Sequence, residues 1–284
     1  MNPLDPLKEH LRRFTGGGIA VAFSGGVDSA LLLSVLAELR SESPFALLAL
    51  TMQSPFQEQT AAAEAERLAR SMGIAWQSLS HNPLAIPSLE YNPPDRCYLC
   101  KRSIFRAFRQ AAVHAGLATL MDGTNADDLG VYRPGRRALN ELGVISPLAQ
   151  CGLTKETIRR LSAVRGLPTA QRPAMPCLAT RFDYGAHLTG EALRRVEKGE
   201  ALLRAMLPPQ TVLRLRVHND LARIEVPPSC FPHLIANREQ ISAAMQRLGF
   251  RFITMDLAGY RSGCYDTALS SGAEKHPVPS QPHQ

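Results

Sequence analysis

The sequence has few aromatic residues and no long apolar segment, and both shortages narrow the possible classes of protein. Phe, Trp and Tyr make up 6% of the 284 residues. They are not interleaved with the arginines, which argues against a surface that stacks nucleic-acid bases. No apolar run reaches the roughly 18–20 residues that a helix needs to cross a bilayer. The first residues also lack the basic start and apolar core of a secretory signal. We therefore expect a soluble, cytoplasmic protein without a membrane partner.

Disulfide bonds are not expected either, although the chain has six cysteines. Thiols stay reduced in the cytosol, so metal, cluster or catalytic roles are the better predictions for some of them. The formal net charge of +7 favours anionic ligands such as nucleotides, phosphorylated metabolites or RNA, without choosing among them. Hydrophobic residues make up 45% of the chain, which is enough for one large or two moderate domains.

The first half of the sequence alternates short apolar runs with helical segments. Four runs are predicted to be strands, at residues 18–23, 46–52, 74–79 and 119–123. Strands that are joined through helices form a parallel sheet with both faces covered. This pattern predicts an α/β domain with a parallel, Rossmann-like sheet over residues 1–170.

The pattern changes after a proline-rich junction at residues 171–186, which carries Cys177. A helix, a hairpin of two alternating strands, a second helix and a last strand follow. In the second helix, Asn237 and Gln240 have the spacing of a capping box. This predicts a smaller α+β domain over residues 187–269. Residues 270–284 are polar and proline-rich, and we expect them to form a disordered tail.

The strongest local signal is the hexapeptide from Ser24 to Ser29, between a buried strand and a helix. Gly25 and Gly26 allow the backbone to approach a phosphate closely, and the free N–H groups at the start of the helix attract an anion. Ser24 and Ser29 add hydroxyl donors. Asp28 repels phosphate, so we predict that it holds a Mg²⁺ ion that bridges phosphate oxygens. The loop lacks Gly-Lys-Ser/Thr, which argues against transfer of the γ-phosphate.

A second polar cluster, residues 123–128, follows the fourth predicted strand. Ligands of open α/β sheets bind at the carboxyl ends of the strands, so this cluster should face the first loop. Asp127 or Asp128 could share the Mg²⁺ ion, and Gly123 and Asn125 could contact the nucleotide or the loop. A simple polar turn is the alternative.

These motifs resemble those of the PP-loop ATP pyrophosphatases, a family with the adenine nucleotide alpha hydrolase-like fold. Further stretches occur in the same order as in the LarE family of ATP-dependent sulfur transferases: Gly123-Thr124-Asn125-Ala126-Asp127-Asp128 with Tyr132-Arg133-Pro134-Gly135, Pro176-Cys177-Leu178-Ala179-Thr180-Arg181-Phe182, and Leu257-Ala258-Gly259-Tyr260-Arg261-Ser262-Gly263. The resemblance runs from about Phe14 to Leu269.

The resemblance implies an activity in the synthesis of the nickel-pincer cofactor. Members of the family use ATP to adenylylate the carboxylates of pyridinium-3,5-biscarboxylic acid mononucleotide and release pyrophosphate. A cysteine sulfur then displaces AMP, which leaves a thiocarboxylate. The matching cysteine is Cys177, which many members sacrifice as dehydroalanine. The family also tends to form homohexamers. Met52 ends the second predicted strand, where PP-loop enzymes bind adenosine, and either a backbone contact to adenine or a core position is expected for it.

Cys97 and Cys100 form a CxxC pair that the simplest family members lack. The pair resembles the three-cysteine subgroup, in which three thiolates hold a [4Fe–4S] cluster and one iron stays open for sulfide from a donor. We therefore predict a cluster on Cys97, Cys100 and Cys177. A structural zinc, or free thiols with a sacrificial Cys177, are the alternatives. Arg172 and Arg181 flank Cys177 in sequence and could lower its pKa if they approach it.

The second domain offers a pair of arginines for the phosphate of the substrate. Arg214 and Arg216 alternate on a predicted strand and so share one face. The resemblance assigns them to the mononucleotide phosphate, and it places Arg181 and Glu225 at the substrate site, with Glu225 able to bind a divalent metal. A solvated strand face is the alternative for the arginines, and a solvated helix face is the expectation for Glu200 and Glu197.

Two other activities fit parts of the sequence. The net charge and the three cysteines are compatible with tRNA thiolation, but we see no added RNA-binding domain and do not expect nucleic acid as a partner. An amidating synthetase that uses ammonia would need the phosphate loop but not Cys177.

Overall fold

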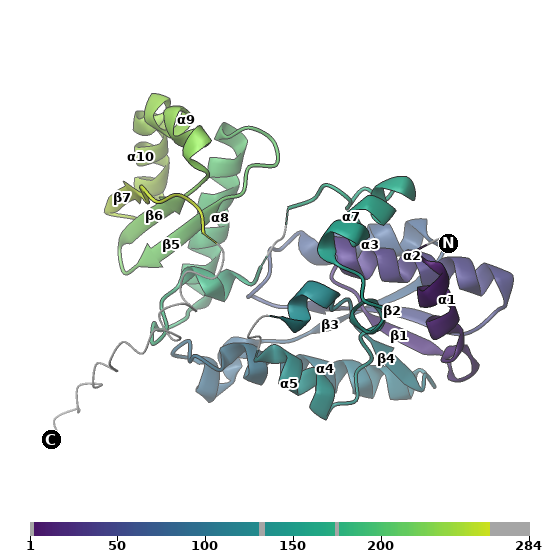
Figure 1. Cartoon of the computed structure of the whole chain (residues 1–284). Coiled ribbons are helices and arrows are strands. Elements are labelled where there is room, and N and C mark those ends of the chain that lie inside the picture. Colours follow the sequence, from purple (N-terminus) through teal and green to yellow (C-terminus); the bar gives the residue numbers. More distant parts are fainter. Residues whose placement is uncertain (1–2, 131–133, 174–175, 262–284) are drawn as a thin grey trace, which may run out of the picture. The chain divides into compact units, whose positions relative to one another are not determined.

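The computed structural model describes residues 3–130, 134–173 and 176–261. The chain divides into two compact units, residues 1–201 and 202–284, and the boundary falls inside helix α8 (Gly190–Met206). Each unit has a sheet of its own (Figure 1). The domain boundaries that the sequence suggested, at residues 170 and 186, stay predictions.

The first unit is built on a parallel sheet of four strands in the order β3-β2-β1-β4. The strands are β1 (Ile19–Ala22), β2 (Leu47–Gln53), β3 (Ala75–Ser80) and β4 (Thr119–Met121). All four had been predicted within three residues at each end. Because the strands are parallel and β1 lies between β2 and β4, the carboxyl ends of these three strands meet at one edge of the sheet. This is the edge at which an α/β sheet binds ligands.

Helices cover both faces of this sheet (Figure 1). One core contains apolar side chains from α1 (Asp5–Arg12), α2 (Val27–Glu42), α3 (Ala61–Ser71), α6 (Pro147–Gln150) and α7 (Lys155–Val164). The other contains side chains from α4 (Arg96–His114) and α5 (Gly135–Glu141). Within β1, Ile19 and Val21 enter the first core and Ala20 enters the second, as the alternation of a strand requires.

The second unit has a mixed sheet of three strands in the order β5-β6-β7. Strand β5 (Arg214–His218) forms an antiparallel hairpin with β6 (Leu221–Glu225), and β7 (Phe252–Met255) runs parallel to β6. Asn219 occupies the hairpin turn with φ of 57°, a conformation that asparagine tolerates well. Helices α9 (Phe231–Ala236) and α10 (Arg238–Arg247) precede β7. The predicted α/β domain followed by a smaller α+β domain is confirmed as the fold class.

The capping box predicted at the start of α10 is wrong. The Asn237 side chain makes no cap hydrogen bond to α10, and its Nδ2 donates to the carbonyl of His233 at 2.8 Å. Because α9 ends directly before Asn237, the side chain satisfies the end of that helix instead.

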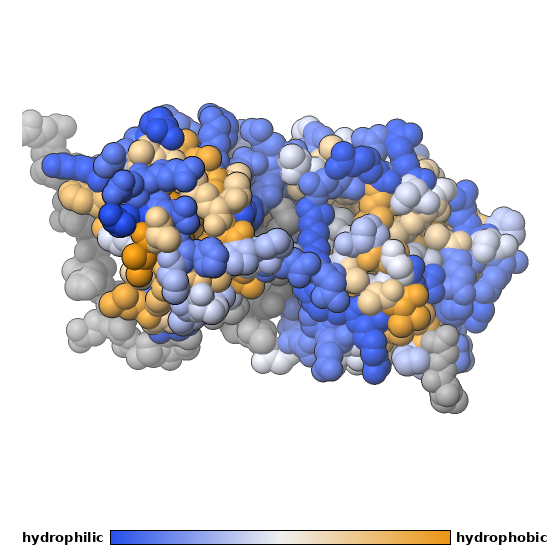
Figure 2. Space-filling model, turned by 90° about the horizontal axis from the view of Figure 1, so that it is seen from above, coloured by the Kyte–Doolittle hydropathy of each residue, from blue (hydrophilic) through white to orange (hydrophobic). Residues whose placement is uncertain are grey.

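None of the helices in the described ranges is long and apolar enough to span a bilayer. On the face seen in Figure 2, apolar side chains lie in small patches between polar ones.

Candidate functional site

The phosphate loop connects β1 to α2 and has the geometry of an anion cradle. Gly25 has φ of 69°, and the Cβ of any other residue there would lie 3.4 Å from the backbone of Ala65. Gly26 is the N-cap of α2, so the N–H groups of the first turn are directed out of the helix. The hydroxyls of Ser24 and Ser29 lie 3.3 Å apart beside them. Backbone amides and two hydroxyls therefore converge at one end of a helix.

The second loop packs against the first, as predicted. A Cβ added to Gly123 would lie only 2.9 Å from the backbone nitrogen of Ser29, so a glycine is required at this contact. Asn125 Nδ2 donates to Asp28 Oδ1 at 3.5 Å. Asn125 and Asp128 also form a reciprocal capping box at the start of a short 3₁₀ segment (Ala126–Leu129), which fixes the loop conformation.

Lys155 completes this edge of the sheet and was missed by the sequence analysis. Its Nζ lies 2.5 Å from Asp28 Oδ2, and its backbone N–H donates to Asp127 Oδ2 at 2.8 Å. A lysine in the first turn of a helix opposes the helix dipole. This unfavourable position could have identified Lys155 from the sequence, because a lysine at the start of a helix needs an anionic partner to offset the helix dipole.

Asp28 is suited to hold Mg²⁺ together with a nucleotide. Its side chain is 21% exposed, and its second oxygen is bound only weakly by Asn125. Within the described residues, no three acidic, His or Cys side chains form a ready metal cage. Mg²⁺ commonly uses one or two carboxylates and completes its shell with phosphate oxygens and water, so such a cage is not needed. Asp127 and Asp128 are occupied by backbone N–H groups.

The three predicted sulfur ligands come from two segments that the fold brings together. Cys97 and Cys100 lie in the first turn of α4, and Cys177 is the N-cap of a 3₁₀ turn (Leu178–Arg181). Burial raises the pKa of the Cys100 thiol to about 12, and the nearby Cys177 and Cys97 sulfurs add to this shift. Burial also raises the pKa of Cys177, while the Arg96 guanidinium opposes the shift. The three sulfurs are therefore close enough to affect one another.

Three neighbouring cysteines are a chemically suitable donor set for a cluster. Among the described residues, no group of three acidic, His or Cys side chains is placed to hold a metal ion, so the choice between a cluster, a zinc ion and free thiols stays a prediction. A four-iron cluster binds each thiolate at a different iron, so its ligands lie farther apart than those of one ion. Three cysteines with a cationic neighbour fit such a group.

The cation with the largest effect on the Cys177 thiol is Arg96. Arg181, one of the two arginines that flank Cys177 in sequence, also lowers the pKa of this thiol, as expected, but to a smaller degree. Arg96 is 4% exposed, and its Nη2 lies 3.5 Å from Cys97 Sγ. Burial disfavours its charged form, but the Cys177 and Cys97 sulfurs outweigh this effect and raise the pKa of Arg96. Arg172 instead pairs with Glu64 of α3.

Arg181 holds the backbone that carries Cys177. Its Nη1 donates to the carbonyls of Pro176 and Cys177, at 2.9 and 3.2 Å. Its other nitrogens form a bidentate pair with Glu200, at 2.8 and 2.9 Å, and both side chains are almost completely buried. The expectation of a solvated Glu200 is wrong, because the buried guanidinium requires a buried counterion. The predicted contact of Arg181 with substrate stays a prediction.

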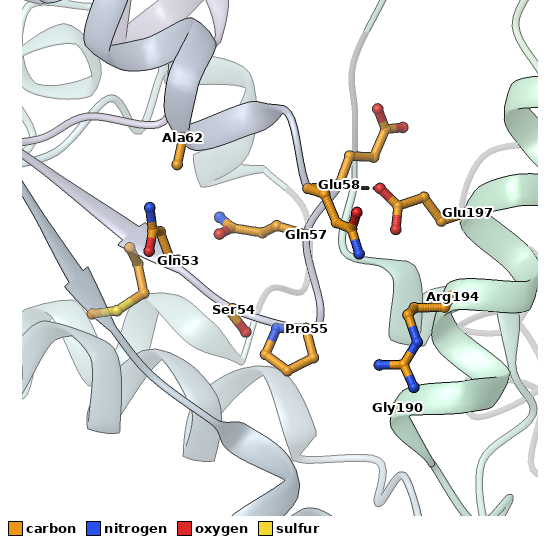
Figure 3. A pocket seen from close by; sticks show the side chains of 11 residues that line it. Gln53, Ser54, Pro55, Gln57, Glu58, Ala62, Gly190, Arg194 and Glu197 are labelled. Atoms are coloured by element: carbon orange, nitrogen blue, oxygen red, sulfur yellow. Dashed lines mark hydrogen bonds between the residues drawn. The ribbon is translucent and has the colours of Figure 1, made fainter.

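A polar cavity of about 400 Å³ lies beside these elements in the first unit (Figure 3). It is bordered by Met52 and Gln53 at the end of β2, by the following loop, and by Arg194 and Glu197 of α8. Glu197 accepts a hydrogen bond from the Gln59 N–H at 2.7 Å, so it is not simply a solvated side chain. Arg194 has no hydrogen-bonded or ion-paired partner among the described residues, which leaves its guanidinium available to an anion.

The same loop is joined to the cysteine segment. The Leu178 N–H donates to the carbonyl of Phe56 at 2.8 Å. Phe56 lies between the cavity-lining residues Pro55 and Gln57. Cys177 is therefore covalently next to a residue that is hydrogen-bonded to the loop following β2.

In the second unit, the two predicted arginines lie on β5 as expected, but they are buried. Arg214 is 7% and Arg216 is 5% exposed, so a solvated strand face is excluded for them. Arg216 Nε donates to Glu225 Oε2 at 3.0 Å, and Arg223 Nη2 donates to Glu225 Oε1 at 3.1 Å. A divalent metal at Glu225 would have to compete with two guanidiniums. Arg214 lies over the ring of Tyr260, 5.2 Å from its centroid.

The remaining three cysteines are Cys151, Cys230 and Cys264, and the first two lie in the described part of the chain. Cys151 makes a 3.9 Å contact to the carbonyl of Pro6, and Cys230 is buried. Tyr132, Arg133 and Cys264 lie outside the described residues.

A parallel sheet whose central strand leads through a glycine-rich anion cradle into a helix defines a nucleotide-binding α/β enzyme. Residues 4–129 match the PP-loop domain. The chain is 36% identical over 271 residues to the uncharacterized protein slr1717 of Synechocystis, covering 94% of this chain and 99% of that protein. It is 31% identical over 252 residues to the pyridinium-3,5-bisthiocarboxylic acid mononucleotide synthase of Lactiplantibacillus plantarum, covering 89% and 90% of the two chains.

The chain belongs to the PP-loop ATP pyrophosphatase family. A weaker similarity, 28% identity over 231 residues, connects it to the tRNA-cytidine(32) 2-sulfurtransferase of Serratia proteamaculans, with 69% of this chain and 71% of that protein covered. ATP use follows from the family.

Proposed function

We propose that the protein is an ATP-dependent sulfur transferase that converts the carboxylates of pyridinium-3,5-biscarboxylic acid mononucleotide into thiocarboxylates. One observation carries this proposal: the Cys177 segment is hydrogen-bonded, through Leu178 and Phe56, to the loop that follows β2. A sulfur nucleophile thus belongs to the same end of the sheet as the phosphate loop. The similarity to the Lactiplantibacillus plantarum synthase supports the substrate class.

The first step activates a carboxylate, which is a poor electrophile at neutral pH. A substrate carboxylate oxygen attacks the α-phosphorus of ATP, and the bond to the bridging oxygen breaks with release of pyrophosphate. The α2 N-terminus, with Ser24 and Ser29, binds the phosphate oxygens. Asp28 would hold a Mg²⁺ ion, which would neutralise part of the phosphate charge. The Lys155 ammonium group, which is paired with Asp28, would stabilise the negative charge on the leaving pyrophosphate.

The second step forms the carbon–sulfur bond. An anionic sulfur attacks the activated carbonyl carbon, and AMP leaves with the electron pair of the carbon–oxygen bond. Arg181 fixes the Cys177 backbone through the Pro176 and Cys177 carbonyls, which limits the positions that the sulfur can take. The adenylate and the sulfur must meet in a site with little water, and the Arg181–Glu200 pair that adjoins Cys177 is itself almost completely buried.

We propose that Cys97, Cys100 and Cys177 hold a [4Fe–4S] cluster. Such a cluster would supply an iron open to an added sulfide, so that sulfur could be delivered repeatedly. Without the cluster, Cys177 would give up its own sulfur and become dehydroalanine. Mass spectrometry after turnover separates the two routes: the loss of one sulfur and two hydrogens at Cys177 indicates sacrifice, and an unchanged chain indicates repeated delivery.

The cavity beside β2 is proposed to take the adenosine of ATP along the Met52 backbone, with Arg194 at its border available to an anionic group. In the second unit, Arg214 and Arg216 are proposed to bind the mononucleotide phosphate, and Glu225 to orient Arg216. Because both arginines are buried, their geometry is fixed before substrate arrives, which favours bidentate phosphate binding. We also propose a homo-oligomer, with a hexamer as the expected size in light scattering.

The test is product analysis with ATP, Mg²⁺ and the dicarboxylate mononucleotide under anaerobic conditions. AMP, pyrophosphate and a thiocarboxylate are expected. ADP and phosphate would contradict the PP-loop reaction.

Thiolation of tRNA is the second candidate, because the chain has 28% identity to a tRNA 2-sulfurtransferase and a net charge of +7. Salt-dependent binding of bulk tRNA, with sulfur incorporated into the RNA, would favour that activity.

A further inference from the structure

Arg96 is a buried cation that, unlike several other arginines of the chain, is not paired with a glutamate of the described ranges. It is 4% exposed at the start of α4. Its Nη1 donates to the Ala179 carbonyl at 3.2 Å and to the Asn92 side chain, and its Nη2 lies 3.5 Å from Cys97 Sγ. Each of these partners belongs to the cysteine site or to a segment next to it.

No carboxylate pairs with Arg96 in the part of the chain that the structure describes. Arg165, Arg172, Arg181 and Arg216 all pair with a glutamate. A buried charge without a counterion is costly, and a guanidinium stays charged in proteins. The groups near Arg96 that can carry negative charge are the sulfurs of Cys97 and Cys177 and, with a smaller effect, the Tyr184 hydroxyl. Of these groups, the Cys97 sulfur is in direct contact with the guanidinium, at 3.5 Å.

We propose that Arg96 is the charge-compensating residue of the sulfur site and that it stabilises anionic sulfur there. Its ligands are the cysteine thiolates and an added hydrosulfide ion, the chemical form in which a sulfur donor would load the site. This inference rests on the proposed sulfur transfer and adds an anion-binding residue to it. A cluster with three thiolates and a bound hydrosulfide carries excess negative charge, and in a buried site one guanidinium offsets a large part of it.

A purely mechanical role for Arg96 is the competing explanation. Asn92 is completely buried with φ of 46°, and its Nδ2 donates to the carbonyls of Phe182 and Asp183 at 3.0 and 2.7 Å. Asn92 and Arg96 together therefore join α4 to the segment after Cys177. Substitutions can separate the two roles, because Asn92→Gly keeps the positive φ and the nearby charge but removes the side-chain hydrogen bonds.

The first experiment uses the full-length protein without metal. Alkylation rates of Cys97 and Cys177 are measured by peptide mass spectrometry with iodoacetate, which is anionic, and with iodoacetamide, which is neutral. Both reagents attack the same thiolate, so the ratio of their rates does not depend on the thiolate fraction. It reports the local electrostatic potential.

Arg96→Gln should lower the iodoacetate-to-iodoacetamide ratio at these cysteines by about tenfold, as expected for loss of one unit charge a few ångströms away. Arg96→Lys should keep most of the ratio. Asn92→Gly and the matched charge control Arg102→Gln, whose side chain binds the Tyr98 hydroxyl, should stay within about twofold of the wild type. An unchanged ratio in Arg96→Gln, or an equal loss in Asn92→Gly, overturns the inference.

The second experiment uses protein reconstituted anaerobically with iron and sulfide. Arg96→Gln should form the cluster with a more negative reduction potential and should bind hydrosulfide about tenfold more weakly, whereas Arg96→Lys should resemble the wild type. A cluster with unchanged potential and hydrosulfide affinity in Arg96→Gln contradicts the inference. If the wild type forms no cluster, the cluster in the proposed function is wrong, and the alkylation ratio still decides the role of Arg96.

Discussion

The phosphate-loop edge and the cysteine site lie in the same unit but are built by different means. The first is made mainly of backbone: the N–H groups at the start of α2, Gly25, which lets the phosphate loop approach Ala65, and Gly123, which lets the two loops touch. The second depends on buried side chains. Asn92, Arg96 and Arg181 donate hydrogen bonds to backbone carbonyls of the segment around Cys177 and so fix that segment in place. A backbone site tolerates changes in side chains but not in backbone conformation, and a side-chain site should behave in the opposite way.

Removing the Cys177 thiol tests most directly whether the cysteine site and the phosphate-loop edge serve separate steps. We expect Cys177→Ala to lose thiocarboxylate formation by at least about 1000-fold, because the variant lacks either a thiolate ligand of the proposed cluster or, in the sacrificial route, the sulfur that attacks the adenylate. Exchange of pyrophosphate into ATP in the presence of the dicarboxylate should stay within about threefold, because adenylylation uses only the phosphate-loop edge. Cys151→Ala is the control. If Cys177→Ala instead converts the dicarboxylate into an amide at the wild-type rate when ammonia is supplied, an ammonia-dependent synthetase becomes the better assignment.

The buried Arg181–Glu200 pair tests whether the cysteine site depends on side chains. Glu200→Gln leaves a buried guanidinium without its counterion and should lower the free energy of unfolding by about 3–5 kcal/mol, measured by urea denaturation. Glu197→Gln, one turn earlier in α8 and partly exposed, should cost less than about 1 kcal/mol. Replacing both partners with Arg181→Met and Glu200→Leu should be less harmful than Glu200→Gln alone. Similar losses in both single variants would speak against this view of the site.

Lys155 is the side chain on which the phosphate-loop edge depends most. Lys155→Gln removes the cation next to Asp28 and should lower kcat for adenylylation by about 100-fold, since it acts on charge that develops as pyrophosphate leaves. Lys155→Arg should retain most of the rate, and Lys198→Gln, at an exposed position of α8, should retain all of it. A rise in KM for ATP with unchanged kcat would show that Lys155 serves ground-state binding instead.

Gly123→Ala tests the backbone side of the comparison. The added Cβ would lie 2.9 Å from the Ser29 nitrogen and must displace the start of α2 or the second loop. We expect a loss of about 1–3 kcal/mol in unfolding free energy and roughly tenfold weaker ATP binding by calorimetry. Gly16→Ala, with open space at the Cβ position, is the matched control and should change neither quantity. Unaltered ATP binding in Gly123→Ala would mean that the two loops do not share the nucleotide.

The same difference explains what could be predicted from the sequence. The phosphate loop is contiguous, and its glycines and the neighbouring strand and helix are visible in one short stretch. That the second loop faces the first followed from the rule that parallel strands end at one edge, although the contact between Gly123 and Ser29 itself was not predicted. Arg96 could not be found in this way. Proximity in sequence indicated Arg172 and Arg181, of which only Arg181 affects the Cys177 thiol, whereas burial and partners are set by tertiary structure. Glu200 was misjudged for the same reason: its helix is amphipathic, but its counterion comes from another segment.

The smallest expected effect is at Glu38, which lies near the end of α2 that is remote from the phosphate loop. A substitution there tests whether charges elsewhere on the helix affect phosphate binding at the loop. Hydrogen bonds from Lys8 and, to a lesser degree, Arg165 hold the pKa of Glu38 below its usual value of 4.5, against the effect of partial burial. A carboxylate with a lowered pKa in the folded state stabilises the protein fully above the unfolded pKa.

This stabilisation is lost as the pH falls through the lowered pKa. The difference in unfolding free energy between wild type and Glu38→Gln should therefore be constant above about pH 5.5 and should shrink towards zero in more acidic solution. Because the side chain is 35% exposed, the difference should stay below about 1 kcal/mol. Lys8→Met should remove most of the pH dependence, since Lys8 makes the largest contribution.

ATP affinity at neutral pH should be equal in all three proteins, because the carboxylate fixes the far end of α2 while the phosphate binds to backbone N–H groups at its start. A measurable loss of ATP affinity in Glu38→Gln would show that the backbone-built site is coupled to side chains about three helical turns away, and the contrast with the cysteine site would then fail.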